Sequence, residues 1–141
     1  ALMRIPEFGS DFEVAVVTGT TPYSLNVGVG WFDDTAAPGQ VGNFAVAGHR
    51  GASGPFVPLL DLTPGSRVIV ETRTATYVYA LTNYPKNQTV DKYETWVIDA
   101  VPGKPDAEPT KKLITLITCR NFFHSAERSV AFGELVETID K

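Results

Sequence analysis

The feature that most constrains this 141-residue chain is a run of apolar and β-branched residues from Leu113 to Cys119. Two lysines precede the run and polar residues follow it, which predicts a strand buried on both faces. The strand ends at the only cysteine of the chain. A second strand, Ser129 to Val136, is predicted after a short connection, with Arg128 at its start. The pattern therefore predicts a thiol and a guanidinium at the ends of two neighbouring strands.

The rest of the sequence alternates short apolar runs with turns rich in proline and glycine. Many short strands with very little helix predict an all-β domain, either a closed barrel or a sandwich. Arg67 to Thr72 and Thr76 to Leu81 alternate with period two and predict a hairpin-like pair. Gly54 to Leu62 is the one predicted short helix. The N-terminal segment from Arg4 to Ser10 is predicted to be extended, and Val101 to Thr110 is predicted to be a surface loop. The other predicted strands are Glu13 to Val17, Ser24 to Val29, Asn43 to Ala47 and Thr95 to Ile98.

Length and composition exclude several classes of protein. A chain of 141 residues suffices for one well-buried core and is short for two domains. A hydrophobic content of 43% argues against disorder. A net charge of −4 without a basic cluster argues against a nucleic-acid partner. No apolar window is long enough to cross a bilayer, the first residues lack the pattern of a signal peptide, and one cysteine excludes an internal disulfide.

His49 favours a catalytic role for Cys119, because it lies in a glycine-flanked turn after a short buried strand, where a side chain is presented rather than packed. A thiolate is a competent nucleophile, and an imidazole can stabilise it or transfer its proton. Arg128 can donate hydrogen bonds to the oxyanion that forms when a thiolate attacks an acyl carbon. The alternative is that Cys119 is a small, buried apolar residue with no catalytic role. His124 and Cys119 without further ligands make a poor zinc site, so we predict no metal and no cofactor.

Four blocks of the sequence, in the right order, resemble the sortase family. Thr115 to Cys119 matches the TLxTC signature, and Ala126-Glu127-Arg128 matches the segment that carries the sortase arginine. Pro38 to Arg50 matches the PGxxGNxxxxGHR block around the catalytic histidine, and Arg4-Ile5-Pro6 is similar to the start of the sortase domain. The matches extend from residue 4 to about residue 137.

The resemblance implies a closed eight-stranded sortase-type β-barrel with one or two short helices. It also implies a single catalytic domain over residues 1–141, with a native N-terminal membrane anchor outside this sequence. By the same resemblance Cys119 is the nucleophile, His49 the acid and base, and Arg128 the group that stabilises the oxyanion or positions the substrate. Thr118, Ala47 and Arg50 are expected to bind substrate, with Thr118 helping to shape the groove.

The family reaction is a transpeptidation in which a thiolate attacks the Thr carbonyl of an LPxTG-like sorting signal. An amine then resolves the thioacyl intermediate. The GHR block and the TLxTC signature are most similar to the actinobacterial class E sortases, some of which accept LAxTG. The implied partners are sorting-signal peptides of secreted surface proteins and a lipid II-type cell-wall amine. The implied location is the outer face of the plasma membrane of a Gram-positive bacterium.

Other readings of the same residues remain open. A class C-like, pilin-polymerising sortase would use the same chemistry. An L,D-transpeptidase also uses Cys, His and Arg, but its SHGCxR-like motif is not supplied by Thr118-Cys119-Arg120-Asn121. A non-catalytic β-barrel binding module would have an unreactive, buried Cys119.

Overall fold

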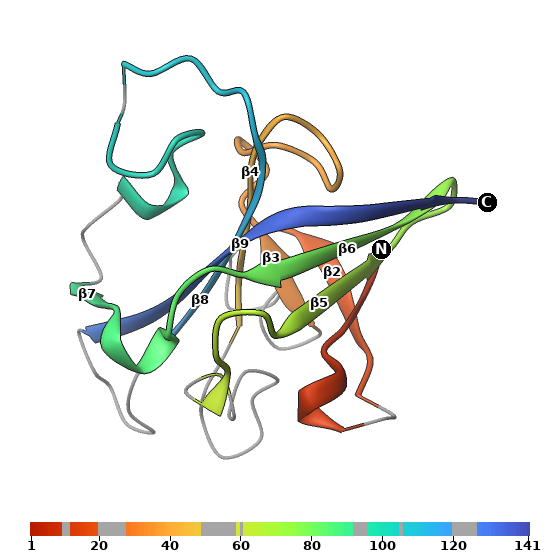
Figure 1. Ribbon diagram of the computed structural model, residues 1–141, viewed down its shortest axis with the longest axis horizontal. Coiled ribbons are helices and arrows are strands. Elements are labelled where there is room, and N and C mark those ends of the chain that lie inside the picture. Colours follow the sequence, from red (N-terminus) through yellow and green to blue (C-terminus); the bar gives the residue numbers. More distant parts are fainter. Residues whose placement is uncertain are drawn as a thin grey trace.

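The computed structural model describes residues 1–9, 12–19, 28–48, 59, 61–91, 96–104, 106–119 and 127–141. This part of the chain forms nine strands and several single-turn 3-10 helices (Figure 1). The strands are β1 (Leu2–Arg4), β2 (Val14–Thr18), β3 (Val29–Trp31), β4 (Gly42–Ala47), β5 (Arg67–Glu71), β6 (Ala75–Leu81), β7 (Thr89–Asp91), β8 (Lys112–Cys119) and β9 (Glu127–Asp140). The helices include η1 (Pro6–Phe8), η3 (Pro85–Asn87) and η4 (Trp96–Ile98).

Eight of the strands close into a barrel. Their order is β6-β5-β1-β2-β3-β4-β8-β9, and pairing of β6 with β9 completes the ring, while β7 lies outside it on β9. The structure thus decides between the barrel and the sandwich, and the expected closed eight-stranded barrel is confirmed. Closure removes the exposed strand edges that an open sheet would leave unpaired.

β9 closes the ring because it is long enough to serve two partners. Its first half pairs with β8 and its second half pairs with β6, so Gly133 lies opposite both Ile114 and Leu81. A Cβ atom at position 133 would come within 2.8 Å of Ile114 Cγ2 and 2.9 Å of the Ala80 carbonyl oxygen. Glycine therefore allows the strands to approach closely at the point where the barrel turns.

We expect Gly133→Ala to lower the free energy of unfolding by about 1–3 kcal/mol, because backbone on one side and a packed isoleucine on the other leave little room to relax. Chemical denaturation would measure the change. Glu134→Ala at the next, half-buried position is the control and should change stability by less than about 0.5 kcal/mol. Equal stability of the two variants would contradict the close approach.

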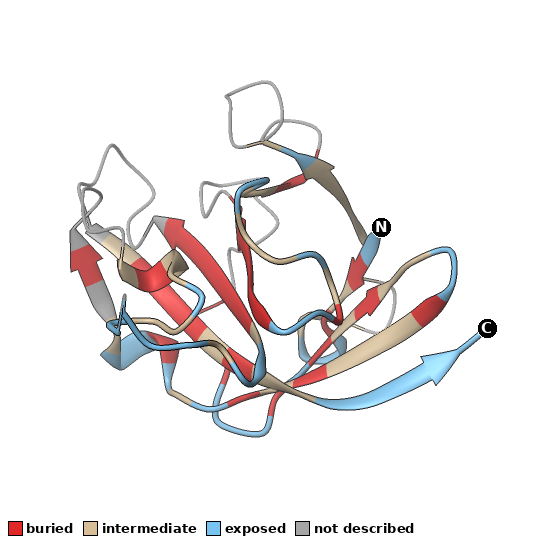
Figure 2. Ribbon diagram, turned by 90° about the horizontal axis from the view of Figure 1, so that it is seen from above, coloured by how far each residue is buried: buried red, intermediate tan, exposed pale blue. Residues whose placement is uncertain are grey.

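The barrel is filled by apolar side chains from every strand of the ring. Figure 2 shows buried residues along most of these strands. Tyr79 is fully buried among them, and its hydroxyl oxygen accepts a hydrogen bond from the backbone N–H of Gly39 at 2.8 Å. Burial raises the pKa of Tyr79 to about 12, so the phenol stays neutral in the core. A second cluster lies outside the barrel, where Val90 and Val97 cover Ile117 and Val130.

The structure corrects three details of the predicted strands. Thr95 to Ile98 was predicted to be a strand, but residues 96–98 form η4, because the segment covers the barrel instead of pairing with an edge. The N-terminal segment contains β1 and η1 rather than a simple extended chain. β7, which the sequence pattern did not predict, adds to β9. The predicted strand at 24–29 and helix at 54–62 lie largely outside the described residues.

Candidate active site

The ends of β8 and β9 bring two of the predicted catalytic residues opposite each other. In the antiparallel register Cys119 pairs with Arg128, and Thr118 pairs with Ser129. Arg128 is half-buried and also pairs with Val90 of β7, so its backbone is fixed on both sides. The structure therefore brings the cysteine and the arginine together at one end of the barrel, as the sequence predicted.

The C-terminal end of β4 lies at the same end, because β4 and β8 are parallel neighbours. Ala47 pairs with Ile117, and the backbone N–H of Gly48 donates a hydrogen bond to the Ile117 carbonyl at 2.9 Å. His49 is the next residue in the sequence. His49 and Arg50 themselves, like residues 120–126, lie outside the described residues.

The two faces of the β8–β9 ribbon carry different side chains near the candidate site. Ile117 and Val130 belong to the outer cluster, and Ala47 is half-buried beside Ile117. Because side chains alternate along a strand, Thr118 and Ser129 occupy the opposite, inner face. Thr118 is 2% exposed, so it lies beneath the outer surface, whereas Ala47 is accessible beside it.

Thr118 and Ser129 are unusual in another respect. Both hydroxyl oxygens are buried, and neither has a hydrogen-bond partner in the part of the chain that the structure describes. Burying a hydroxyl without a partner is unfavourable and rare in folded proteins. The two face one another in the register, directly beside the Cys119–Arg128 pair. Ser129 was not singled out from the sequence, although a serine inside an apolar strand is a visible signal.

We expect Thr118→Val to raise the free energy of unfolding by about 1 kcal/mol or more, because an isosteric change removes an unpaired buried hydroxyl. Thr115→Val is the matched control on the same strand. Thr115 is also buried, but its hydroxyl donates a 2.7 Å hydrogen bond to Asn43 Oδ1, so its loss should destabilise the protein. Denaturation curves that move in the same direction for both variants would refute this difference.

Asn43 connects the barrel to the segment that covers it. Its amide nitrogen donates hydrogen bonds to the carbonyls of Val97 at 2.9 Å and Asp99 at 3.0 Å. η4 is thereby held against β4, and Val97 packs in the outer cluster with Ile117 of β8. Asn43 belongs to the PGxxGNxxxxGHR block and had no predicted role, although an asparagine in a buried strand requires partners of this kind.

Two clefts open on the described surface. One, of about 700 Å³, lies beside η4 and the ribbon, where Trp96, Phe132 and Lys104 are among its walls. It includes part of the loop predicted between Val101 and Thr110. The other, of about 690 Å³, lies between the N-terminal strands and the turn that joins β5 to β6. Among the described residues, no group of three or more His, Cys, Asp or Glu side chains is arranged to hold a metal ion.

Comparison with known proteins gives one consistent answer. The sequence profile described as Sortase domain matches residues 3–136. The chain is 31% identical over 136 residues to sortase SrtE2 of Streptomyces coelicolor, covering 92% of this chain and 53% of that protein. It is 32% identical over 130 residues to sortase A of Listeria monocytogenes, covering 91% and 53%. The chain thus spans about half the length of these curated relatives.

Solved structures agree with the sequence comparisons. Sortase E from Streptomyces avermitilis superposes with a TM-score of 0.86 at 32% identity, covering 99% of this chain and 88% of that one. The SrtF sortase from Corynebacterium diphtheriae superposes with a TM-score of 0.89 at 32% identity, covering 99% and 85%.

Proposed function

We propose a function from one premise, which the family match shows: this chain belongs to the sortase family. Sortases are bacterial, membrane-associated cell-envelope enzymes that act on sorting-signal substrates and amine acceptors. No helix in the described part of this chain is long and apolar enough to span a bilayer. We propose that the protein is a cysteine transpeptidase that cleaves an LPxTG- or LAxTG-like sorting signal and transfers it to a cell-wall amine.

The observation that carries the proposal is the register at the end of the barrel. Cys119 and Arg128 are directly opposite in an antiparallel pair, so their backbones are neighbours across the β8–β9 ladder. The hydrogen bond from Gly48 to Ile117 ties the residue before His49 to β8, the strand that carries Cys119. Paired strands therefore hold the backbones of Cys119 and Arg128, which favours precise positioning.

In the first half of the proposed reaction the Cys119 thiolate attacks the Thr carbonyl of the signal. A C–S bond forms, the Thr–Gly C–N bond breaks, and His49 gives a proton to the leaving amine. Arg128 donates hydrogen bonds to the oxyanion of the tetrahedral intermediate. In the second half an amine attacks the thioester, a C–N bond forms, the thiolate leaves, and His49 takes the proton of the amine.

We propose that Ala47 and Arg50 contact the peptide, while Thr118 shapes the groove from beneath. The half-buried position of Ala47 beside Ile117 supports an apolar contact, and burial of Thr118 supports an indirect role. In the native protein an N-terminal anchor would hold this domain on the outer face of a Gram-positive plasma membrane, near lipid II-type acceptors and secreted surface proteins.

Turnover of paired LPxTG and LAxTG peptides, with and without a glycine-based amine, tests the proposal. We expect hydrolysis without amine and a ligated product with it, and the faster peptide identifies the motif. If neither peptide were turned over and Cys119 were alkylated slowly, the results would favour the non-catalytic binding module.

A further inference from the structure

The second cleft lies away from the candidate active site. Its lining includes Lys141, which follows β9 and stands 13 positions after Arg128. Along a strand that separation corresponds to a contour of about 40 Å. In Figure 1 β7 and the start of β9 are on the left, whereas both chain termini are on the right. The cleft is therefore separate from the proposed transpeptidation chemistry.

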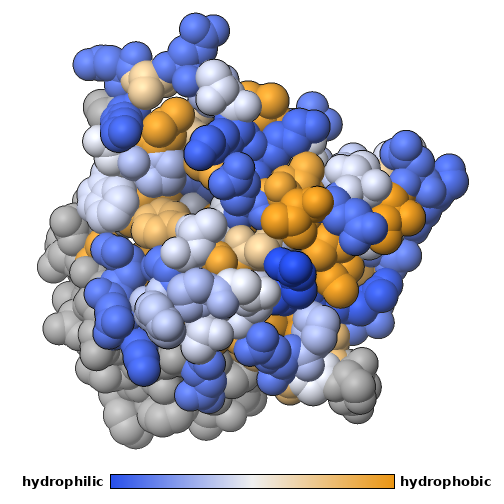
Figure 3. All heavy atoms as spheres, viewed as in Figure 1, coloured by the Kyte–Doolittle hydropathy of each residue, from blue (hydrophilic) through white to orange (hydrophobic). Residues whose placement is uncertain are grey.

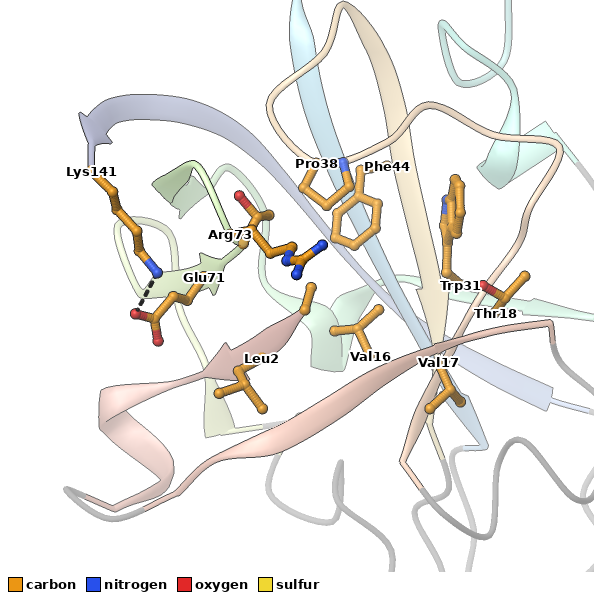
Figure 4. Close-up of a pocket in the computed structure, with 12 residues that line it drawn as sticks. Leu2, Val16, Val17, Thr18, Trp31, Pro38, Phe44, Glu71, Arg73 and Lys141 are labelled. Carbon is orange, nitrogen blue, oxygen red and sulfur yellow. Dashed lines mark ion pairs between the residues drawn. The ribbon is translucent and has the colours of Figure 1, made fainter.

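The walls of this cleft are mainly apolar. Val16 of β2, Trp31 of β3 and Phe44 of β4 line it, and Leu2 and Pro38 complete the apolar surface (Figure 4). The indole N–H of Trp31 already donates to Thr35 Oγ1 at 3.1 Å and lies 3.2 Å from the Ala36 carbonyl oxygen. Its ring therefore serves as an apolar wall. A volume of about 690 Å³ with a few polar groups is typical of a site for a small ligand.

The rim of the cleft is cationic although the whole chain is acidic. Lys141 Nζ lies 3.0 Å from Glu71 Oε2, and Arg4 pairs with the other oxygen of the same carboxylate. A hydrogen bond from Lys141, and then one from Arg4, lower the pKa of Glu71, so the only acidic side chain of the lining is ionised and neutralised.

Arg73 is the cation that remains. In the described part of the chain it has no ion-pair or hydrogen-bond partner. Figure 4 shows its side chain extending over the cleft toward Phe44. An uncompensated guanidinium above an apolar wall is complementary to a ligand with an anionic head and an apolar body.

The surface near the termini carries further apolar side chains. Leu2 is 38% exposed, and Val136 and Ile139 of β9 are 54% and 49% exposed. Figure 3 shows apolar patches toward the right of the same view, on the side where the termini lie. Exposed apolar side chains beside cationic ones are typical of surfaces that contact lipid.

We propose that this cleft binds one anionic phospholipid of the membrane surface, with an acyl chain along Val16 and Trp31 and the phosphate at Arg73. The site requires no contribution from Cys119, so it does not depend on the proposed transpeptidase function. It would orient the domain on the membrane by its cleft side and leave the Cys119 end of the barrel facing away.

Monomeric lysophosphatidylglycerol with a brominated acyl chain is the probe, because bromine quenches nearby tryptophan. The chain has two tryptophans, so a Trp96→Phe background makes Trp31 the reporter. We expect saturable quenching by this probe, at least about fivefold weaker binding of brominated lysophosphatidylcholine, and no competition by glycerol phosphate alone. Arg73→Gln should weaken binding by about tenfold, as expected for loss of a charged hydrogen bond.

Arg67→Gln is the matched control, because it removes the same charge from an exposed position outside the cleft lining. It should change binding less than about twofold. Equal losses in the two variants, or absence of quenching, would overturn the site.

Sedimentation with phosphatidylglycerol vesicles tests whether the protein binds the lipid in a membrane. Binding of the monomeric lipid without binding of the vesicles would overturn the membrane-lipid assignment. Short-peptide turnover should be unchanged in Arg73→Gln, which separates this result from failure of the proposed function.

Discussion

Cys119→Ala is expected to abolish both peptide cleavage and amine-dependent transfer, with a loss of at least about 10³-fold in kcat. Removal of a nucleophile from a set of residues that act together eliminates the covalent route, so no other residue of the set can compensate. Cys119 terminates β8 opposite Arg128, and the backbone ladder of that pair does not depend on the thiol. The variant should therefore retain the fold while losing activity.

Three measurements make this expectation specific. Intact-protein mass spectrometry of the wild type with peptide and no amine should show an adduct with the mass of the acyl fragment, and the variant should show none. Denaturation curves of the two proteins should agree within about 1 kcal/mol. Gly133→Ala, which should alter stability and leave the thiol in place, controls for loss of activity through unfolding. Turnover by Cys119→Ala within tenfold of the wild type would exclude Cys119 as the nucleophile.

The sequence predicted the parts of the fold in which pattern and tertiary environment agree. The run from Leu113 to Cys119 is β8 almost to the residue, because a strand buried on both faces needs apolar residues at every position. The hairpin of β5 and β6 was equally visible, since alternation along each strand sets its register. Neither pattern distinguishes a barrel from a sandwich, because that choice depends on the pairing of β6 with β9.

The errors have a common physical origin. β-branched residues in η4 suggested a strand, but Asn43 binds the carbonyls of Val97 and Asp99 and holds the segment as a cover. Tertiary hydrogen bonds here override local propensity. β7 is three residues long and obtains its stability from β9, so its own sequence carries almost no signal.

The sequence named candidate site residues, but it did not predict the contacts that support them. Spacing alone left Cys119 and His49 separated by 70 positions. The parallel pairing of β4 with β8 brings the end of the strand that precedes His49 in the sequence to the end of the strand that carries Cys119. That the hydroxyls of Thr118 and Ser129 lack partners in the described part of the chain could not be foreseen, because pairing is a property of the packed structure. Positions that break a packing rule beside a candidate site are where functional constraint is expected.

Arg128→Lys is expected to lower kcat/KM for peptide turnover by about 10²-fold, although it keeps the charge. A guanidinium presents several N–H donors in a fixed fork, whereas an ammonium is a point charge on a flexible stem. Removing one well-placed oxyanion donor typically costs about 10²–10³-fold. Because β7 and β8 fix the backbone of Arg128 on both sides, the shorter reach of lysine cannot be corrected by a shift of the strand.

A comparison of two reactions of the same thiol separates stabilisation of the oxyanion from activation of the nucleophile. Alkylation by iodoacetamide forms no oxyanion, so Arg128→Lys should slow it far less than it slows peptide turnover. Arg67→Lys, an exposed arginine outside the site, should leave both rates within about twofold of the wild type. If Arg128→Lys slowed both reactions equally, the guanidinium would act on the thiolate and not on the intermediate. If it slowed neither, the pairing of Arg128 with Cys119 would be structural, and stabilisation of the oxyanion would have to come from backbone N–H groups at the same end of the barrel.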